Sequence, residues 1–291
     1  MDGHRNHVDL HLHSTASDGV FTPSEVVRLS LERELAVIAL TDHDTLSGVA
    51  EAQRAARATG LEVVPGVEVN AEGEWGDVHF LGYFVDPDRG PLCAMLRDIR
   101  EARVARARAM VERLREMGMA LDWAEVQTLA TGDSVGRPHV ARALARRGYV
   151  HTVPEAFDRF IGNDGPAYVP RPRLTPPEVI QAILDSGGVP VIAHPAHTGP
   201  AVVARIPEFA GYGLQGVEVY YPLHPPETVE RLLGLCREHG LLATGGSDFH
   251  GLGIKEGTQL GSVYVPCECV ERLREAAAAQ RRVVQRDGGA M

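Results

Sequence analysis

Lysine is almost absent from this sequence: of its 29 basic residues only Lys255 is a lysine, and the rest are arginines. Long hydrophobic runs are absent too, because no stretch approaches the roughly 20 apolar residues that span a membrane. The opening MDGHRNHVDLHLH lacks the charged-then-apolar pattern of a secretory signal. These absences predict a cytoplasmic protein with no membrane partner.

Cysteine is also scarce, and the four cysteines form no C-x-x-C pair, which predicts free thiols: Cys93, Cys236, Cys267 and Cys269. Any metal chemistry must therefore come from imidazole and carboxylate groups. The formal net charge of -10 argues against a protein that coats long nucleic acid. It leaves room for a nucleotide or a short oligoribonucleotide held by bound cations. The oligomeric state is open.

The chain of 291 residues fits one large α/β domain, with or without an insertion. Short β-like runs alternate with helical segments at both ends of the chain, and this rhythm predicts a parallel sheet or barrel. The predicted strands are 8–13, 37–44, 61–70, 77–84, 189–195, 216–221 and 241–250. Between them, a long Arg-rich helix over about 92–117 opens further helical sequence. We predict a barrel domain over 1–88 and 166–285, and an all-helical insertion over 89–165.

Polar residues recur where the predicted strands end. Six histidines follow this rule: His11, His13, His43, His79, His194 and His250. Glu68 and Asp248 share it. In α/β barrels the carboxyl ends of the strands meet on one face, so these side chains are expected to converge. A single strand-end histidine is more often structural, but burying so many ionisable groups together is costly without cations.

The His11-x-His13 spacing favours metal binding, because residues i and i+2 of a strand point to the same side and can hold one ion together. Mixed nitrogen and oxygen ligands suit Mn, Fe or Zn better than Mg or Ca. The sequence therefore predicts bound divalent ions of the first kind.

The blocks VDLHLHSTASDG, ALTDHD, GVEV, VIAHP and GSDFH resemble, in this order, the motifs of the PHP (polymerase and histidinol phosphatase) family. The resemblance covers nearly the whole chain apart from the insertion. It implies a distorted seven-stranded (β/α) barrel, a metal-dependent phosphoesterase activity and two or three divalent ions. The implied ligands of the first ion are His11, His13, Glu68 and Asp248. Glu68 would bridge to a second ion with His79 and His194, and a third would be held by Asp18, His43 and His250.

The His-x-His start is also typical of amidohydrolase barrels, which often bridge two metals with a carboxylated lysine. No lysine stands in the middle of this chain. Glu68 is a natural carboxylate bridge instead, so PHP chemistry is favoured.

The predicted insertion contains Gly136-Arg137-Pro138-His139, which resembles a motif of PHP phosphoesterases that act on nucleotides. This implies that Arg137 and His139 bind substrate phosphate, since the planar Arg fork matches two phosphate oxygens. An ordinary helix start after a glycine is the alternative. Other candidate site residues flank later strands. His197 is a phosphate contact, a proton donor or neither, and Tyr220, Tyr221 and His224 line the pocket or pack beneath a loop.

The predicted reaction is hydrolysis of a nucleotide phosphomonoester, a 3′,5′-nucleoside bisphosphate or 5′-AMP, by a metal-bound hydroxide that attacks phosphorus in line. Arg137 would balance charge on the phosphoryl oxygens. A 5′-3′ exoribonuclease acting on short RNA and a histidinol-phosphate phosphatase are the enzymatic alternatives. A non-enzymatic metal-binding module is the third, and the filled ligand positions argue against it.

Overall fold

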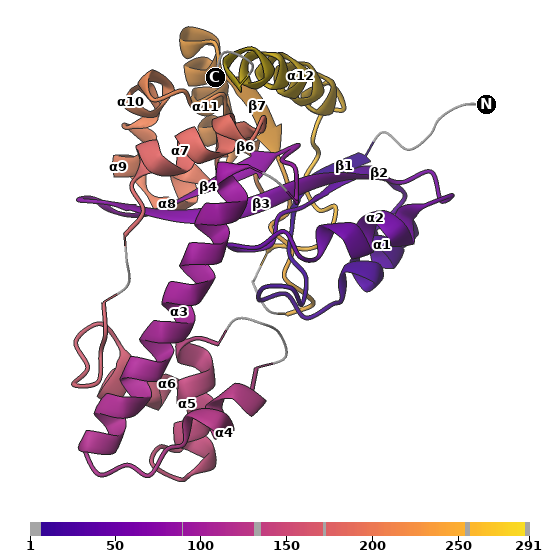
Figure 1. Ribbon diagram of the computed structural model, residues 1–291. Helices are drawn as coiled ribbons and strands as arrows, with labels where there is room; N and C mark the ends of the chain where they lie inside the picture. The colour runs from indigo at the N-terminus through magenta and orange to yellow at the C-terminus, as the bar shows by residue number, and fades with distance from the viewer. Residues whose placement is uncertain (1–6, 89, 131–134, 171–172, 254–256, 289–291) are drawn as a thin grey trace. The chain divides into compact units, whose positions relative to one another are not determined.

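A computed structural model describes residues 7–88, 90–130, 135–170, 173–253 and 257–288 of the chain. The chain forms two compact units (Figure 1). Unit 1 comprises Met1–Met95 and Leu174–Met291, and unit 2 comprises Leu96–Arg173. Unit 1 is an α/β unit, whereas the described secondary structure of unit 2 is entirely helical.

Unit 1 is built on one seven-stranded sheet whose spatial order follows the chain order. Its strands are β1 (His7–Leu12), β2 (Leu35–Leu40), β3 (Glu62–Gly73), β4 (Gly76–Tyr83), β5 (Val189–Ile192), β6 (Gly216–Tyr220) and β7 (Leu242–Gly245). The predicted seven-stranded α/β fold is confirmed. The sheet is mixed, because β4 runs antiparallel to both neighbours and the other strand pairs are parallel. Only Glu74 and Trp75 separate β3 from β4, and a parallel crossover needs a dozen or more residues.

Helices of unit 1 pack beside consecutive strands: α1 and α2 contact β2 and β3, α7 contacts β3 to β5, and α11 contacts β6 and β7 (Figure 1). They are α1 (Pro23–Glu32), α2 (Val49–Ala56), α7 (Pro176–Asp185), α8 (Pro195–Thr198), α9 (Pro200–Val203), α10 (Ile206–Gly211), α11 (Pro226–His239) and α12 (Glu268–Gly288). Helices α1 and α7 each begin with a capping box, at Thr22 and Thr175. In these two connections the sequence at the helix start fixes where the chain turns back toward the next strand.

The two outer strands of the sheet approach each other through residues just after β7. The backbone N–H of Asp248 donates to the carbonyl of His11 at 2.9 Å, and that of His13 donates to Phe249 at 3.0 Å. The buried Asp9 carboxylate reinforces this seam by accepting from the Ser247 N–H at 2.8 Å. Among the described residues β1 and β7 share no strand ladder. The contacts above join the two ends of the sheet instead, and the sheet takes a barrel-like form.

Unit 2 has its own hydrophobic core, in which Met110, Leu114, Val126, Val140 and Leu144 are fully buried. Its elements are α3 (Pro91–Glu116, which begins in unit 1), α4 (Trp123–Thr128), α5 (Arg137–Arg146), α6 (Val153–Ala156) and the π-helix η1 (Phe157–Ile161). The core positions recur three or four residues apart, as an amphipathic helix requires.

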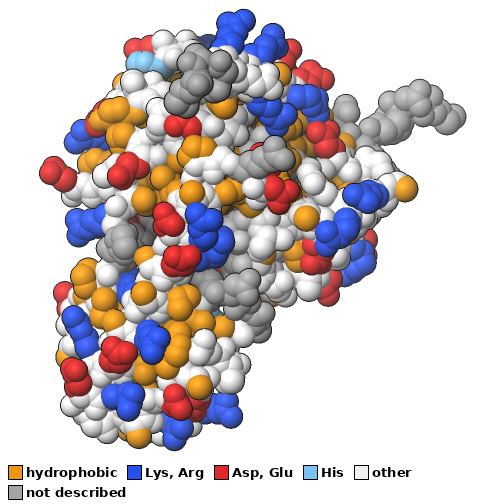
Figure 2. All heavy atoms as spheres, viewed as in Figure 1, with side chains coloured by type: hydrophobic (Ala, Val, Ile, Leu, Met, Phe, Trp, Pro, Cys, Tyr) orange, Lys and Arg blue, Asp and Glu red, His pale blue; other side chains and the backbone are white. Residues whose placement is uncertain are grey.

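Charged side chains of both signs are interspersed on the face shown in Figure 2. In unit 2 several arginines pair with nearby acids, among them Arg147 with Glu125 at 2.6 Å and Arg108 with Glu112 at 3.7 Å. The arginines on this face therefore do not form a single-sign stripe of the kind that tracks a nucleic-acid backbone.

The four cysteines are free thiols, as predicted. Among the described helices, none is both long enough and apolar enough to cross a membrane.

Candidate metal centre

The ends of the strands of unit 1 bring the predicted ligands to one edge of the sheet. His11 lies within β1, Glu68 within β3 and His79 within β4. His43 follows β2 and pairs with Glu68 in an isolated parallel bridge, which places the two residues level. The remaining strand-end ligands, which follow β1, β5 and β7, are His13, His194, Asp248 and His250.

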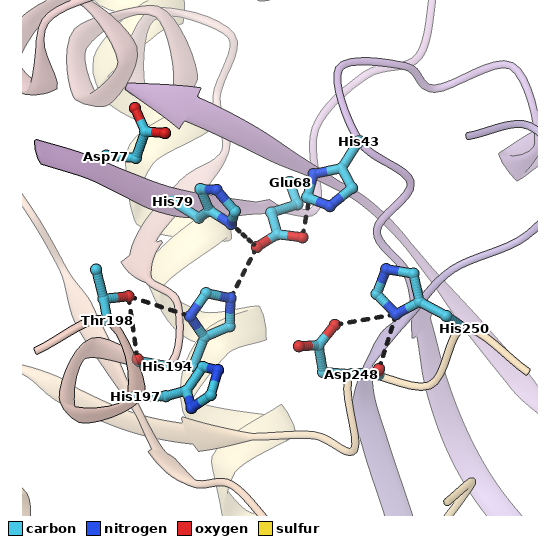
Figure 3. A pocket seen from close by; sticks show the side chains of 9 residues that line it. All are labelled: His43, Glu68, Asp77, His79, His194, His197, Thr198, Asp248 and His250. Carbon is cyan, nitrogen blue, oxygen red and sulfur yellow. Dashed lines mark hydrogen bonds and ion pairs between the residues drawn. The ribbon is translucent and has the colours of Figure 1, made fainter. Parts of the chain in front are cut away.

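Glu68 is the centre of this cluster, with only 1% of its surface exposed. One carboxylate oxygen, Oε1, lies 2.8 Å from His79 Nδ1 and 3.1 Å from His194 Nε2. The other, Oε2, lies 3.2–3.3 Å from nitrogens of His11, His13 and His43. Figure 3 shows His43, His79 and His194 directed at this carboxylate. A carboxylate with separate neighbours at each oxygen is suited to bridge two cations.

Two aspartates complete the cluster. Asp248 Oδ1 lies 3.3 Å from His13 Nε2 and 3.4 Å from His250 Nδ1. Asp18, on the loop after β1, lies 3.4 Å from His250 Nε2 and 3.9 Å from His43 Nε2. Asp248 is buried, whereas 56% of the Asp18 side chain is exposed. The cluster thus runs from the barrel interior to the solvent.

Three overlapping groups have the geometry to hold an ion: His11, His13, Glu68 and Asp248; His43, Glu68 and His79; and His13, Asp18, His43 and His250. The first equals the set implied for the first ion. The second lacks His194, whose Nε2 nevertheless lies beside the same Glu68 oxygen as His79. The third adds His13 to the implied set. All nine predicted ligands are therefore brought together, while their division among ions stays a prediction.

The carboxylates and histidines of the cluster shift one another's pKa values. Burial alone would raise the pKa of Glu68, but His43, His11 and His79 hold it well below its usual range. Burial would likewise lower the pKa of His13, yet the nearby carboxylates of Asp248 and Glu68 raise it to about 9. His43 shows the opposite outcome, because burial dominates and lowers its pKa to about 4. Within the cluster, the protonated form is therefore favoured at His13 and disfavoured at His43.

The donor set fits a metal on one further observation. Both ring nitrogens of His13 are buried and have no hydrogen-bond partner among the described residues. Two carboxylate oxygens nevertheless lie within 3.3 Å of His13 Nε2, without the direction of a hydrogen bond. A buried imidazole left unsatisfied is costly. A cation between these atoms would satisfy the nitrogen and both carboxylates.

Backbone strain is concentrated around the cluster. His194 has φ +28°, Asp248 has φ +56° and Asp44, next to His43, has φ +54°. Residues other than glycine rarely adopt this region, and they persist there only where surrounding contacts enforce it. The unusual backbone aims the side chains of two predicted ligands into the site.

A cavity of about 480 Å³ opens over the cluster. It is lined by His43, Glu68, Asp77, His79, His194, His197, Thr198, Asp248 and His250 (Figure 3). The predicted site residue His197 is thus at the cavity. Asp77 and Thr198 were not predicted, and their sequence context carries no signal. The Thr198 hydroxyl lies 3.4 Å from His194 Nδ1, so its contact is with a predicted ligand.

The region after β6 differs from the prediction. Tyr220 packs with the hydrophobic cluster that contains Val265 and Leu273, so its ring is not brought to the metal cluster. Its neighbour Tyr221 is 2% exposed, and its hydroxyl donates to Asp248 Oδ2 at 3.0 Å. His224 is buried against Tyr221, with ring centroids 5.1 Å apart. It is not among the residues that line the cavity.

Arg137 and His139 belong to unit 2, at the start of α5. Arg137 lies over the Phe157 ring at 5.5 Å and donates to Asn163 Oδ1 at 3.2 Å. The N–H of Gly136 donates to His139 Nδ1 at 3.0 Å, so this imidazole caps the helix. Burial, followed by the charges of Arg142 and Arg103, lowers the pKa of His139. The neutral ring accepts at Nδ1 and therefore carries its hydrogen on Nε2, as a donor.

Known proteins match this chain in sequence and in fold. The family model of the PHP domain matches residues 9–90. A 3′,5′-nucleoside bisphosphate phosphatase from Chromobacterium violaceum is 36% identical over 257 residues, which cover 84% of this chain and 88% of that protein. A 5′-3′ exoribonuclease from Haemophilus influenzae is 34% identical over 245 residues, covering 83% and 89%.

A solved structure from Bifidobacterium adolescentis, assigned as a metal-dependent phosphoesterase, has a TM-score of 0.76 and 33% identity to this chain. The match covers 94% of this chain and 97% of that one. The chain therefore belongs to the PHP family, and the predicted resemblance is confirmed.

Proposed function

We propose that this protein is a metal-dependent phosphoesterase that hydrolyses phosphomonoesters of nucleotides. The observation that carries this proposal is the convergence of six histidines and three carboxylates on one buried cluster beneath a cavity. The similarity to a nucleoside bisphosphate phosphatase over most of both chains supports the substrate class. We infer two or three divalent ions, and the mixed imidazole and carboxylate donors favour Mn, Fe or Zn.

The ions would be held by three sets of residues. His11, His13, Glu68 and Asp248 would hold the first, and Glu68 would bridge to a second held with His79 and His194. Asp18, His43 and His250 would hold the third. Bound divalent ions supply Lewis-acid chemistry, since they neutralise phosphate charge and make water acidic enough to deprotonate near neutral pH.

The residues of the chain would supply substrate binding and orientation. We propose that Arg137 and His139 bind a phosphate group, the first through its planar fork and the second through Nε2–H. His197, exposed at the cavity, is positioned to contact the substrate or to protonate the leaving oxygen. The helical unit 2 would then act as a substrate cap. Tyr220 is not retained as a substrate contact, because its ring packs with a hydrophobic cluster.

A short oligoribonucleotide is the second candidate substrate, because an exoribonuclease is 34% identical to this chain. The net charge of -10 and the interspersed surface charges favour small substrates over extended RNA. The exoribonuclease reaction breaks an internucleotide phosphodiester and the phosphatase reaction a phosphomonoester, and both are attacks of water on phosphorus that the same cluster would serve.

A phosphate-release assay tests the proposal. The protein reconstituted with Mn²⁺ should release phosphate from adenosine 3′,5′-bisphosphate or AMP, and not from histidinol phosphate. A 5′-phosphorylated tetraribonucleotide, analysed for mononucleotide release, distinguishes the exoribonuclease. Inactivity on all nucleotides with Mn²⁺ bound would contradict the proposed function, and a preference for histidinol phosphate would replace it.

A further inference from the structure

β6 is the exception among the seven strands of unit 1. Every other strand contains or directly precedes one of the predicted metal ligands, whereas no predicted ligand comes from β6 or from the residues just after it. Two ionisable side chains of this segment are nevertheless directed at the cluster. Glu218 is fully buried, and Tyr221 is 2% exposed.

Glu218 contacts two predicted ligands, one at each carboxylate oxygen. Its Oε1 lies 2.9 Å from His11 Nδ1, and its Oε2 accepts from the backbone N–H of His194 at 2.7 Å. With the hydrogen on His11 Nδ1 held by this contact, Nε2 is the ring nitrogen that faces Glu68 and Asp248 and that an ion would bind. The second holds the peptide N–H of His194, the residue with φ +28°.

Tyr221 acts on Asp248 in the corresponding way. Its hydroxyl donates to Oδ2 at 3.0 Å, and Oδ1 is the oxygen that faces His13 and His250. A carboxylate with one oxygen held by a buried donor has a fixed orientation for the other. Asp248 also has φ +56°, so both its backbone and its side chain are constrained.

A β-bulge explains why two residues three apart face the same site. Along β6, Glu218 pairs with Thr244 and Tyr220 pairs with Gly245, so two steps on β6 match one step on β7. In a regular strand Glu218 and Tyr220 would share a face. The extra residue reverses the alternation, which turns Tyr220 away and Tyr221 toward Asp248.

We propose that Glu218 and Tyr221 are positioning residues that orient His11, His194 and Asp248 for metal binding, and that β6 serves this role instead of supplying a ligand. The inference rests on the proposed metal site. Carboxylates that orient a ligating histidine raise its basicity and fix its ring. Two different implied ion positions depend on Glu218, since His11 belongs to the first and His194 to the second.

Tyr221→Phe is the main test, because it removes one hydroxyl and keeps the ring. We expect its affinity for Mn²⁺, measured by competition with a chromophoric chelator, to fall about 10- to 100-fold. Tyr83→Phe is the matched control. Tyr83 is also fully buried, but its hydroxyl donates to the backbone carbonyl of Leu10 at 2.9 Å, and among the described residues no hydrogen bond joins it to a predicted ligand. The control should lose stability and keep the Mn²⁺ affinity of the wild type.

Glu218→Gln is the second test. The amide keeps one acceptor oxygen, but its NH₂ group faces a donor, so one of the two contacts is lost. We expect a drop in Mn²⁺ affinity of about 10- to 100-fold, with a changed electron paramagnetic resonance spectrum of the bound Mn²⁺. Activity at saturating Mn²⁺ should recover partly in both variants, which a residue contacting substrate would not allow.

The outcomes separate this inference from the proposed function. If wild-type protein binds Mn²⁺ and hydrolyses nucleotides while Tyr221→Phe and folded Glu218→Gln bind Mn²⁺ equally well, the positioning role is overturned and the function stands. A Tyr83→Phe variant that loses as much affinity as Tyr221→Phe would also overturn it. If the wild type binds no divalent ion, the proposed function and this inference fall together.

Discussion

Glu68 is the side chain that contacts most of the histidines of the cluster. Its two oxygens lie within 3.3 Å of nitrogens from five histidines, which lie in or just after four different strands. Nearby histidines hold the pKa of Glu68 and the pKa of Asp248 well below their usual ranges. Ions and protons therefore compete for the same atoms. Changes of pH are expected to act on metal binding through that competition.

Metal binding is expected to strengthen as the pH rises. The pKa of His13 is raised to about 9, so at pH 7 the metal-free ring is protonated and must release its proton to bind an ion. One displaced proton gives about a tenfold gain in apparent affinity per pH unit, up to the pKa of His13. Titration calorimetry in buffers of different ionisation enthalpy would count the protons. An affinity for Mn²⁺ that is flat between pH 6 and 8 would contradict the exchange.

The same shift has the opposite sign for the stability of the metal-free protein. A histidine with a raised folded-state pKa stabilises the fold fully below its ordinary pKa of about 6.5, and this contribution is lost as the pH rises through about 9. Chelated protein should therefore become less stable to urea across this window.

Arg137→Ala should retain bound metal and lose most activity, because the guanidinium fork is proposed to bind substrate phosphate. Losing one such charged donor costs about 100- to 1000-fold in reactions that develop negative charge. Metal analysis and kcat/KM for adenosine 3′,5′-bisphosphate check both parts. Arg146→Ala, at the other end of α5, is the control and should behave as wild type. Loss of metal in Arg137→Ala would place this arginine elsewhere in the mechanism.

At the scale of elements, Gly246 sets how closely the ends of the sheet approach. A Cβ atom at this position would lie 2.4 Å from the His11 backbone nitrogen and 2.5 Å from its Cβ. Real Cβ atoms do not come so close, so β1 or the residues after β7 would have to move. The separation of His11 from Asp248 depends on that contact.

Gly246→Ala should therefore destabilise the fold by about 1–3 kcal/mol, as overpacking of a well-packed core does. It should also weaken Mn²⁺ binding, because His11 would be displaced. Urea denaturation and Mn²⁺ titration measure the two effects. Gly211→Ala, where no atom lies within 4 Å of the added Cβ, should be neutral in both. A stable Gly246→Ala variant with normal metal binding would show that the seam tolerates separation.

Elements also decide what could be predicted from the sequence. The alternation of apolar strands and helices is a periodic signal that locates the strand ends. Because the polar residues lie at those ends, the ligand cluster could be predicted from the sequence. The antiparallel direction of β4 depended on the shortness of the Glu74-Trp75 turn, and the order of strands and helices alone does not indicate that length. Which of Tyr220 and Tyr221 faces the cluster depended on a register shift in β6, and alternation within one strand gives no sign of it. Glu218, flanked by Val217 and Val219, was the missed signal: an acid within a buried strand requires a partner.

At the scale of the whole molecule, ion binding should stabilise the fold, because the ligands come from strands at both ends of the chain and meet only in the folded state. An ion at 100 times its Kd stabilises by about 2.7 kcal/mol. Removing divalent ions with a chelator should lower Tm, and Mn²⁺ should restore it in a concentration-dependent manner. An unchanged Tm across this cycle would contradict preferential binding to the folded state.

The contacts between β1 and the residues after β7 have a consequence for biosynthesis. His11 and His13 leave the ribosome first, but Asp248 joins them only after most of the 291 residues have been made. A nascent chain that ends before β7 offers the nitrogens of His11 and His13 together with Glu68, and lacks the aspartate. The proposed metal site would therefore be completed late in translation, and truncated translation products would be unable to complete it.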